Sequence, residues 1–417
     1  MKSDSFFYIS GDEYCIKVTD GTHYSPKSVE CGNYLVTSKH IKGESIDFSS
    51  AYLISKEDYD EINLRSRVEQ WDVIISMIGA YCGFCFIESN PDINYAVKNV
   101  GLFKAGNELN AKWLYYYLSS PVGKAHLEAG KLGSTQPYIS LGSLRKLPIL
   151  TPRDENLKEK IVRVLDSIQQ KISINNHIKT ELEVMAKTLY DYWFVQFDFP
   201  DSNGKPYKTS GGKMVYNTAL KREIPAGWEV KNIGAVARTE LGGTPSTAID
   251  DYWENANIPW LSSSETASFP VISSEQMITQ SGIDNSAATL LPKGTVVISI
   301  VRYIRPSILG LDAATNQSVV GIRENRKFKS SFIYPYFCHE VPRLMGLRTG
   351  AQQPHINKGT IDNSPIVIPP AETLASYYSI SDAVFEKIMT HAFQIDELKK
   401  LRDWLLPLLM NGQVTVK

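Results

Sequence analysis

Cysteines and long apolar runs are scarce in this sequence. Five cysteines among 417 residues are too few and odd in number for a disulfide framework, and they fit a reducing, cytoplasmic setting. They are Cys15, Cys31, Cys82, Cys85 and Cys338. No apolar stretch approaches the ~20 residues that span a bilayer, and no signal peptide is expected at the start. Cys82 and Cys85 have the spacing of half a zinc site, but a suitable second pair is missing, so we interpret both as buried strand residues.

An excess of positive charge is also missing. Lys and Arg number 44, Asp and Glu number 45, and the net charge is −1. A nucleic acid would therefore have to be bound through local patches of the surface or with the help of a partner protein.

Motifs of catalysis are missing as well. The sequence has neither a Walker phosphate loop nor a Gly-x-Gly-x-x-Gly motif. Asn90-Pro91-Asp92 lacks the second proline and the aromatic residue of the Asn-Pro-Pro-Tyr motif and is interpreted as a turn. His23 and His355 have no evident acid or nucleophile partner, and Glu397 lies in a heptad pattern without a carboxylate cluster. We predict that this chain has no catalytic residue, no metal site and no cofactor of its own.

What the sequence does contain is a long helical pattern from Pro152 to about Phe194. Pro152 suits the first turn, Asp154 and Glu155 suit the positive end of a helix, and no Gly or Pro follows until Pro200. Apolar residues recur in steps of four and three, which is the heptad pattern of a helix that packs on another long helix. A second such pattern runs from about Pro370 to Leu409. The residues predicted at the interface of this helix pair are Leu157, Ile161, Val164, Ile168, Ile178, Leu182, Met185, Leu189, Phe385, Ile388, Ile395, Leu398 and Leu405.

The chain also repeats itself. Six residues recur 217 positions later without a gap: Gly133 as Gly350, Gln136 as Gln353, Pro137 as Pro354, Ile139 as Ile356, Gly142 as Gly359 and Pro148 as Pro365. Each copy is followed by one of the long helices, and each is preceded by a buried strand, at Asp72–Ile78 and at Gly294–Ile300. The chain is therefore predicted to be a tandem repeat of a globular domain and a helix.

The predicted architecture is α+β. Two mixed α/β globular domains are joined by two long antiparallel helices that form a coiled coil, with internal pseudo-two-fold symmetry. The expected boundaries are residues 1–150 for the first domain, 151–197 for the central helix, 198–226 for a linker loop, 227–368 for the second domain and 369–417 for the C-terminal helix.

Such a molecule would hold two similar heads at a fixed separation. DNA with two half-sites is one target, because the symmetry of a protein and of its site mirror each other. The alternative is a non-enzymatic, two-headed scaffold that recognises proteins, which the near-neutral charge favours.

Several segments resemble the specificity subunit of type I restriction-modification systems. They are Gly-Trp-Glu-Val with Gly-Gly-Thr-Pro-Ser-Thr (227–247), Ile258-Pro259-Trp260, Gln-Gln-Pro-His-Ile-Asn (352–357), Leu-Leu-Pro-Leu-Leu-Met-Asn-Gly-Gln-Val (405–414), Asp-Gly-Thr-His-Tyr-Ser-Pro (20–26) and Met185–Phe194. The resemblance covers essentially the whole chain, although the first domain lacks a Gly-Trp-Glu opening.

The resemblance implies a function and partners. Each globular domain would be a target-recognition domain that reads one half of a bipartite double-stranded DNA site. The helix pair would set the spacer and dock two copies of an adenine methyltransferase subunit, which carries the S-adenosylmethionine and flips the target base. A restriction motor-nuclease subunit would complete the complex.

Residues for contacts to DNA are sought among cations, amides and hydroxyls on loops. The candidates in the first domain are Thr22, His23, Lys27, Lys39, His40, Lys42, Arg65 and Arg67. Those in the second domain are Thr244, Ser246, Arg302, Tyr303, Arg305, Gln317 and Arg348. The Gln-Pro segments at 136–137 and 353–354 occur in both domains, so they are interpreted as structural and not as base-reading.

Overall fold

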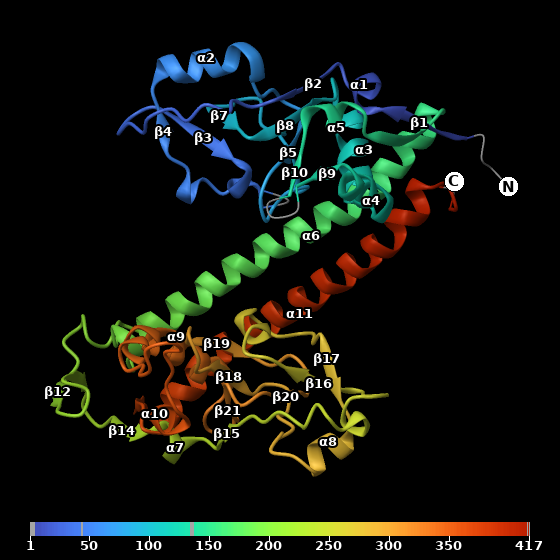
Figure 1. Cartoon of the computed structure of the whole chain (residues 1–417). Coiled ribbons are helices and arrows are strands. Elements are labelled where there is room, and N and C mark those ends of the chain that lie inside the picture. Colours follow the sequence, from blue (N-terminus) through green and yellow to red (C-terminus); the bar gives the residue numbers. More distant parts are fainter. Residues whose placement is uncertain (1–4, 43–44, 134–136, 415, 417) are drawn as a thin grey trace. The chain divides into compact units, whose positions relative to one another are not determined.

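The computed structural model describes residues 5–42, 45–133, 137–414 and 416 (Figure 1). Two compact units make up the chain. Unit 1 comprises Met1–Ile172 with Glu397–Lys417, and unit 2 comprises Ser173–Asp396. Each unit therefore holds one globular part together with a portion of both long helices.

Unit 1 is built on a four-stranded antiparallel sheet in the order β2-β8-β5-β6. Its strand β5 is buried at every residue, as predicted from the apolar run that follows Asp72. A three-stranded sheet in the order β4-β3-β7 contains a parallel β3–β7 pair, and β1 pairs with β11. The strands are β1 (Phe6–Ser10), β2 (Lys17–Asp20), β3 (Asn33–Thr37), β4 (Leu53–Ile54), β5 (Asp72–Ser76), β6 (Cys85–Ile87), β7 (Tyr95–Lys98), β8 (Val100–Lys104), β9 (Lys131–Leu132), β10 (Tyr138–Ile139) and β11 (Pro148–Pro152).

The short helices of unit 1 begin where their sequence supplies a cap. The side chains of Ser55, Asn107 and Ser120 each accept a backbone N–H from the first turn, and Pro121 occupies the start of α4. Figure 1 shows α2 beside the strands of the three-stranded sheet, where it contacts β7. The helices are α1 (Gly11–Tyr14), α2 (Lys56–Ser66), α3 (Glu108–Ser119), α4 (Pro121–Ala129) and α5 (Leu141–Arg145), with 3-10 turns at Ser38–His40 and Phe48–Ser50.

Unit 2 repeats the two sheets and the two-stranded ribbon of this plan. Its four-stranded sheet has the order β15-β21-β18-β19, its three-stranded sheet the order β17-β16-β20 with a parallel β16–β20 pair, and β14 pairs with β22. The strands are β12 (Met214–Asn217), β13 (Arg222–Pro225), β14 (Glu229–Asn232), β15 (Thr239–Leu241), β16 (Ile258–Leu261), β17 (Gln276–Ile278), β18 (Val296–Ser299), β19 (Arg305–Ile308), β20 (Ala314–Thr315), β21 (Val319–Ile322) and β22 (Pro365–Ile368). The helices are α7 (Ile233–Val236), α8 (Gln280–Asp284), α9 (Ser330–Gly346) and α10 (Lys358–Asp362), with 3-10 turns at Asp250–Tyr252 and Glu265–Ala267. The predicted internal repeat is confirmed.

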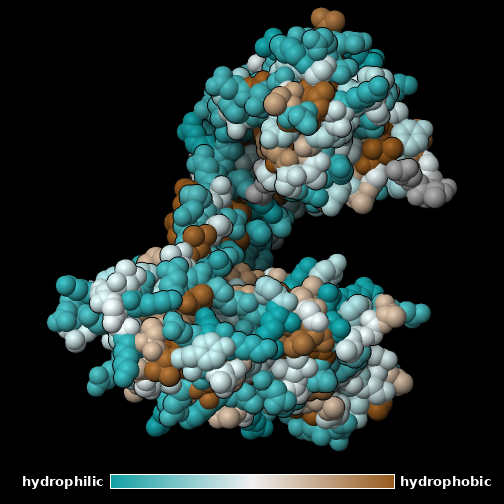
Figure 2. Space-filling model, turned by 90° about the vertical axis from the view of Figure 1, so that its left-hand side faces the viewer, coloured by the Kyte–Doolittle hydropathy of each residue, from teal (hydrophilic) through white to brown (hydrophobic). Residues whose placement is uncertain are grey.

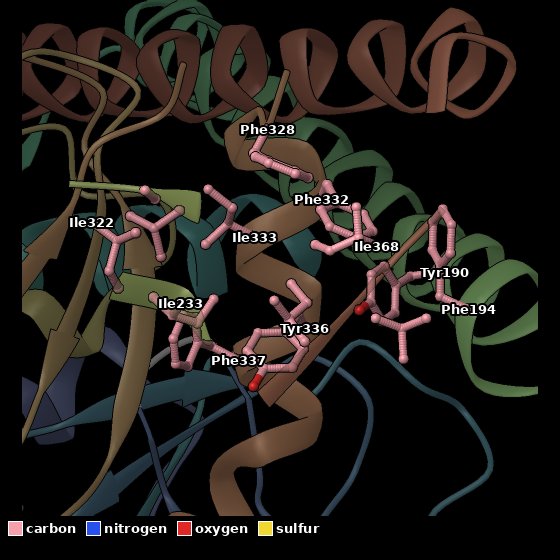
Figure 3. Close-up of a cluster of buried hydrophobic side chains, with 14 of the residues drawn as sticks. Tyr190, Phe194, Ile233, Ile322, Phe328, Phe332, Ile333, Tyr336, Phe337 and Ile368 are labelled. Atoms are coloured by element: carbon pink, nitrogen blue, oxygen red, sulfur yellow. The ribbon is translucent and has the colours of Figure 1, made fainter. Parts of the chain in front are cut away.

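Large aromatic side chains fill both cores. In unit 2, α9 sends Phe332 and Phe337 toward Ile322 of the sheet and Ile368 of β22, as Figure 3 shows. Phe194 joins them, with its ring 4.9 Å from that of Phe332 in an edge-to-face arrangement. In unit 1, Trp113 and Tyr117 of α3 share a buried cluster with Ile161 and Leu165 of the long helix. Each globular part is therefore packed directly onto a helical segment.

The two long helices are α6 (Glu155–Tyr190) and α11 (Ala371–Met410), and a π-helical turn, Asp191–Val195, follows α6. Pro152 does not occupy the first turn of α6, contrary to the prediction, because it ends strand β11. The cap is Asp154, whose carboxylate accepts the N–H of Asn156 at 3.0 Å. Among the described residues, no helix combines the length and the apolar character needed to cross a membrane.

The buried stripe of α6 differs in part from the predicted one. Ile161 and Ile168 are buried as predicted, Leu182 packs on Val384 and Ile388 of α11, and Leu157, Val164 and Leu189 are partly buried. The prediction is wrong for Ile178 and Met185, because these side chains are 37% and 48% exposed. Their neighbours Lys179 and Ala186 face inward instead: Lys179 donates to the carbonyl of Phe269, and Ala186 is buried beside Val384. On α11, Ile388 and Ile395 are buried and Phe385, Leu398 and Leu405 are partly buried.

Residues 198–226 are not a structureless linker. They contain the antiparallel hairpin β12–β13, in which Met214 pairs with Pro225. Phe199 stacks on Tyr207 at 4.8 Å and on Trp228 at 4.9 Å. The many Gly and Pro residues that suggested a linker form the turns around this aromatic stack, so the segment is an ordered part of unit 2.

Candidate nucleic-acid interface

One edge of the four-stranded sheet gathers three loops in each unit. In unit 2, Ser299 at the end of β18 pairs with Val319 at the start of β21 and with Arg305 at the start of β19. Leu241 at the end of β15 pairs with Val320. The segments that follow β15 and β18 and those that precede β19 and β21 therefore meet at one edge. The register of β2, β5, β6 and β8 gives unit 1 the same edge.

The first feature of this edge is the polar junction, where the loop after β2 or β15 meets the turn before β8 or β21. The backbone is the same in both units. Gly21 donates its N–H to the carbonyl of Val100 at 2.9 Å, and Gly242 donates to that of Val319 at 3.1 Å. Gly242 has no room for a side chain, because a Cβ would lie 2.2 Å from the carbonyl oxygen of Asn316. Gly21 and Gly242 thus allow close approach of two backbone segments.

The side chains of the polar junction differ between the units. In unit 1, His23 Nδ1 lies 3.0 Å from Asn99 Oδ1. At the corresponding place in unit 2, the Thr244 hydroxyl donates to Gln317 Oε1 at 2.5 Å. The two pairs have different donors and acceptors on one backbone framework.

Asp20 holds two of the predicted contact residues of unit 1, His23 and Arg65. His23 Nε2 lies 3.1 Å from Asp20 Oδ2, and the Arg65 guanidinium donates to Oδ1 of the same buried carboxylate. The side chains of His23 and Arg65 remain 65% and 59% exposed. Both are therefore held in place but can be reached from solvent.

The second feature is the tyrosine junction, where the segment after β5 or β18 meets the Gln-Pro segment. In unit 2, Arg302 donates its N–H to the carbonyl of Pro354 at 2.8 Å, and Ile356 donates to that of Ile300 at 3.0 Å. Tyr303 is 60% exposed, and the Arg305 guanidinium lies 5.0 Å from the centre of its ring.

Unit 1 has the same junction with other side chains. Gly79 donates its N–H to the carbonyl of Pro137 at 3.2 Å, and Ile139 donates to that of Met77 at 2.9 Å. Lys42 Nζ lies 4.2 Å from the centre of the Tyr81 ring and donates to its hydroxyl at 3.0 Å. Each unit therefore places a cation over a tyrosine in this loop.

The shared Gln-Pro segments have a structural part in these junctions. The carbonyls of Pro137 and Pro354 each hold the residue that follows the buried strand, in the same way in both units. Gln136 lies outside the described residues, and Gln353 is exposed. Arg348, at the start of the same segment in unit 2, donates to the carbonyls of Met345 and Arg302.

The remaining candidates lie on loops or at helix ends. Lys27, Lys39, Arg67 and Ser246 are exposed. Thr22 is partly buried and accepts the N–H of Tyr24 through its hydroxyl at 3.1 Å.

His40 is the clear error among the predicted DNA contacts. Its side chain is completely buried, and Nδ1 accepts the backbone N–H of Thr37 at 2.9 Å. Burial also lowers the pKa of this imidazole. His40 closes a short turn and cannot reach DNA, so its prediction as a DNA-contacting residue is wrong.

Two residues that the sequence analysis missed belong to these junctions, Asn99 and Tyr81. Asn99 lies in the turn between two strand-like runs and adopts a positive φ of 55°, which Asn tolerates better than most residues. Tyr81 lies in the loop between β5 and β6, two residues after Gly79. An aromatic residue close to a glycine after a buried strand was the available signal.

Cys82 and Cys85 are buried, as predicted. Cys82 Sγ lies 3.4 Å from the carbonyl of Met77, and burial raises the pKa of the Cys85 thiol to about 12. Within the part of the chain that the structure describes, no group of three or more His, Cys, Asp and Glu residues is placed to hold a metal ion.

Comparison with known proteins agrees with this repeat. The family model described as the type I restriction modification DNA specificity domain matches residues 28–184 and 225–400, one match for each globular part. The MjaIX type I restriction enzyme specificity subunit of Methanocaldococcus jannaschii is 28% identical over 342 residues, covering 80% of this chain and 76% of that protein. The HindI specificity subunit of Haemophilus influenzae is 21% identical over 414 residues, covering 84% of this chain and 88% of its own.

A solved structure has the same fold. The type I restriction-modification S subunit from M. genitalium superimposes with a TM-score of 0.61 over 98% of this chain and 97% of that chain, at 12% identity. Because the family model matches both globular parts and most of the chain, this protein belongs to the family of type I restriction-modification DNA specificity subunits.

Proposed function

We propose that this chain reads a bipartite double-stranded DNA sequence, with one half-site for each globular part. One observation carries the proposal: the two units share the same backbone arrangement at the sheet edge but present different side chains there. The polar junction presents His23 and Asn99 in unit 1 and Thr244 and Gln317 in unit 2. Base edges in the major groove differ in their donors and acceptors, so different side chains on one framework suit two different half-sites.

The helices α6 and α11 form an antiparallel coiled coil in this proposal and set the spacer between the half-sites. The contacts in unit 2 support it, because Asn175 donates to Gln394 Oε1 at 3.2 Å and Ala186 clusters with Val384 and Ile388. In unit 1, Arg402 donates to Gln169 Oε1 at 2.9 Å. Rising residue numbers on α6 match falling numbers on α11 in this series, which is the order of an antiparallel pair.

The same helices dock two copies of an adenine methyltransferase subunit, and a restriction motor-nuclease subunit joins them. An apolar stripe on α6 supports a docking role. Ile174, Ile178 and Met185 are 58%, 37% and 48% exposed and recur on one helix face. On the face drawn in Figure 2, most apolar residues stand as separate spots in a mainly hydrophilic surface.

This chain is then the recognition component and not the catalyst. S-adenosylmethionine binds to the methyltransferase subunit, which also supplies the chemistry of methyl transfer. The assembly works in the cytoplasm, where DNA is available and the thiols of this chain stay reduced.

The test is an exchange of the second globular part. Residues 227–368 are replaced by the corresponding residues of another family member, and the chain is expressed with its methyltransferase partner. Sequencing of methylated sites should show one changed half-site and one unchanged half-site. A change in both halves, or in neither, contradicts the proposal.

A two-headed scaffold for protein partners is the alternative, and both matches to a DNA specificity domain disfavour it. It would gain support if the assembled complex bound duplex DNA without sequence preference and without a steep dependence on salt.

A further inference from the structure

Arg302 has an unusual backbone for an arginine. Its φ is +61°, in the left-handed region that side chains with a Cβ rarely adopt. The corresponding residue of unit 1 is Gly79, with a φ of +81° and the same hydrogen bond to a proline carbonyl. The repeat therefore uses one backbone conformation twice, once with the residue that suits it and once with an arginine.

The surrounding structure holds this conformation firmly. The N–H of Arg302 donates to the carbonyl of Pro354, and the carbonyl of Arg302 accepts from the Arg348 guanidinium. The backbone nearby is hydrogen-bonded as well. The N–H of Ile300, two residues before Arg302, donates to the carbonyl of Ser318 at 2.9 Å, and the N–H of Tyr303 is also bonded. The Cα of Arg302 is thus fixed on both sides.

The side chain of Arg302, in contrast, is exposed. In the part of the chain that the structure describes, its guanidinium makes no hydrogen bond or ion pair. The other arginines at this edge are engaged: Arg348 donates to backbone carbonyls and Arg305 lies over Tyr303. The five N–H donors of Arg302 remain available to a ligand at the sheet edge.

We propose that Arg302 is a specificity-determining residue of the second unit and that it reads a guanine edge in the major groove. This inference rests on the proposed function. The planar guanidinium fork matches the O6 and N7 acceptors of guanine, which is the most frequent specific contact of arginine with DNA. A phosphate contact would need only a flexible surface cation, whereas base reading benefits from a fixed Cα.

The inference explains why an unfavourable conformation is kept. Glycine at position 302 would satisfy the backbone better, as Gly79 does in unit 1. An arginine in its place lowers stability, and its side chain makes no hydrogen bond within the described residues. A contact between the Arg302 side chain and a ligand outside this chain accounts for both the unfavourable backbone conformation and the unbonded guanidinium.

Two variants and one control test it in the complex with the methyltransferase subunit. Arg302→Gly removes the fork and the strain, and Arg302→Lys keeps the charge and the strain but removes the fork. The control is Lys221→Gly, because Lys221 is an exposed cation with a φ of +52° in the β12–β13 turn. Binding is measured on a panel of duplexes that differ by one base pair, together with thermal unfolding.

Arg302→Gly and Arg302→Lys should each lose about ten- to hundred-fold preference at one G·C pair of the second half-site and leave the first half-site unchanged. Arg302→Gly should unfold at the same temperature as the wild type or higher, while Arg302→Lys should not gain stability. Lys221→Gly should also gain stability but keep the full preference for the DNA sequence.

Other outcomes overturn the inference. A uniform loss of affinity for all duplexes with a shallower salt dependence would show a phosphate contact. Unchanged preference in both variants would show that Arg302 does not touch DNA. These results leave the proposed function intact, whereas a wild-type complex without any sequence preference would overturn both.

Discussion

At the scale of single residues, the two units differ most where their backbones agree best. Gly79 and Arg302 share a positive φ and a bond to a proline carbonyl, yet one has no side chain and the other has a long cation. His23 and Thr244 occupy equivalent loops and contact different amide side chains. Substitutions at such positions alter what the sheet edge presents without altering the fold that supports it.

Asp72 gives a prediction about pH. It lies buried on β5, accepts the N–H of Glu69 at 2.7 Å and contacts Lys104 Nζ at 2.6 Å, and burial raises its pKa to about 6. Between about pH 4 and pH 6 the folded chain keeps a proton that the unfolded chain has released. Raising the pH through this window should therefore lower the free energy of unfolding, by on the order of 2 kcal/mol.

The control for this prediction is Asp72→Asn, which keeps an acceptor for Glu69 but cannot ionise. Urea unfolding of the wild type and the variant across pH 4 to 7 measures the difference. The wild type should lose stability relative to the variant as the pH rises. A constant difference would mean that Asp72 does not titrate in this window.

Some residue roles could be predicted from the sequence and others could not. The Gly-Thr and Gly-Gly-Thr loops were identified by their resemblance to the family, and Gly242 shows why glycine suits the close approach of two backbone segments. The burial of His40 could not be predicted, because the Thr-Ser-Lys-His segment looks like an ordinary polar loop. In the structure the imidazole is completely buried and accepts the backbone N–H of Thr37.

At the scale of elements, α6 shows how two stripes can compete on one helix. The pattern of apolar residues fits a stripe through Val164, Ile178 and Met185 and also one through Leu165, Ile172 and Ala186. Leu165, Ile172 and Ala186 are buried, whereas Val164 is only partly buried and Ile178 and Met185 are exposed. Both stripes share Ile161, Ile168 and Leu182, so the spacing of apolar residues could not distinguish them. The surfaces that pack against α6 decide which stripe is buried.

Alanine substitutions distinguish the two stripes. Leu165 is completely buried, so Leu165→Ala should lower the free energy of unfolding by about 2–5 kcal/mol through lost packing and a residual cavity. Met185 is 48% exposed, so Met185→Ala should change it by only about 0.5 kcal/mol. Chemical unfolding of both variants provides the comparison, and an equal loss in Met185→Ala would mean that Met185 is packed as closely as Leu165.

At the scale of the whole molecule, the tandem repeat was predictable in outline. The matches at a spacing of 217 residues identified it, because six identities in one ungapped register are hard to obtain by chance. The hairpin in residues 198–226 was hidden, since its Gly and Pro residues also suit a linker. The loops that carry the candidate contacts depend on strand register across each sheet, which local sequence does not display.

The proposed ruler role of the helices predicts a change in spacer length. Seven residues are added to each helix in heptad register, between Ile172 and Ser173 and between Asp396 and Glu397, where both helices pass from one unit to the other. A heptad adds ~10 Å of helix, so the preferred spacer should lengthen by about 3 base pairs with both half-sites unchanged.

Sequencing of methylated sites measures this result. The matched control adds the seven residues to α6 alone, which breaks the register with α11 and should abolish methylation. An unchanged spacer in the doubly extended protein would contradict the ruler role.

The pairing of β1 with β11 and of β14 with β22 has a consequence for exchange between proteins. Within each globular part the chain enters and leaves through neighbouring strands, Phe6 opposite Pro152 and Glu229 opposite Ile368. A transplanted head is therefore joined to the chain at one two-stranded ribbon and has to fit, besides it, the helical segment on which it packs. A gene for such a protein can acquire a new recognition sequence as a cassette, with the remainder of the chain left as it was.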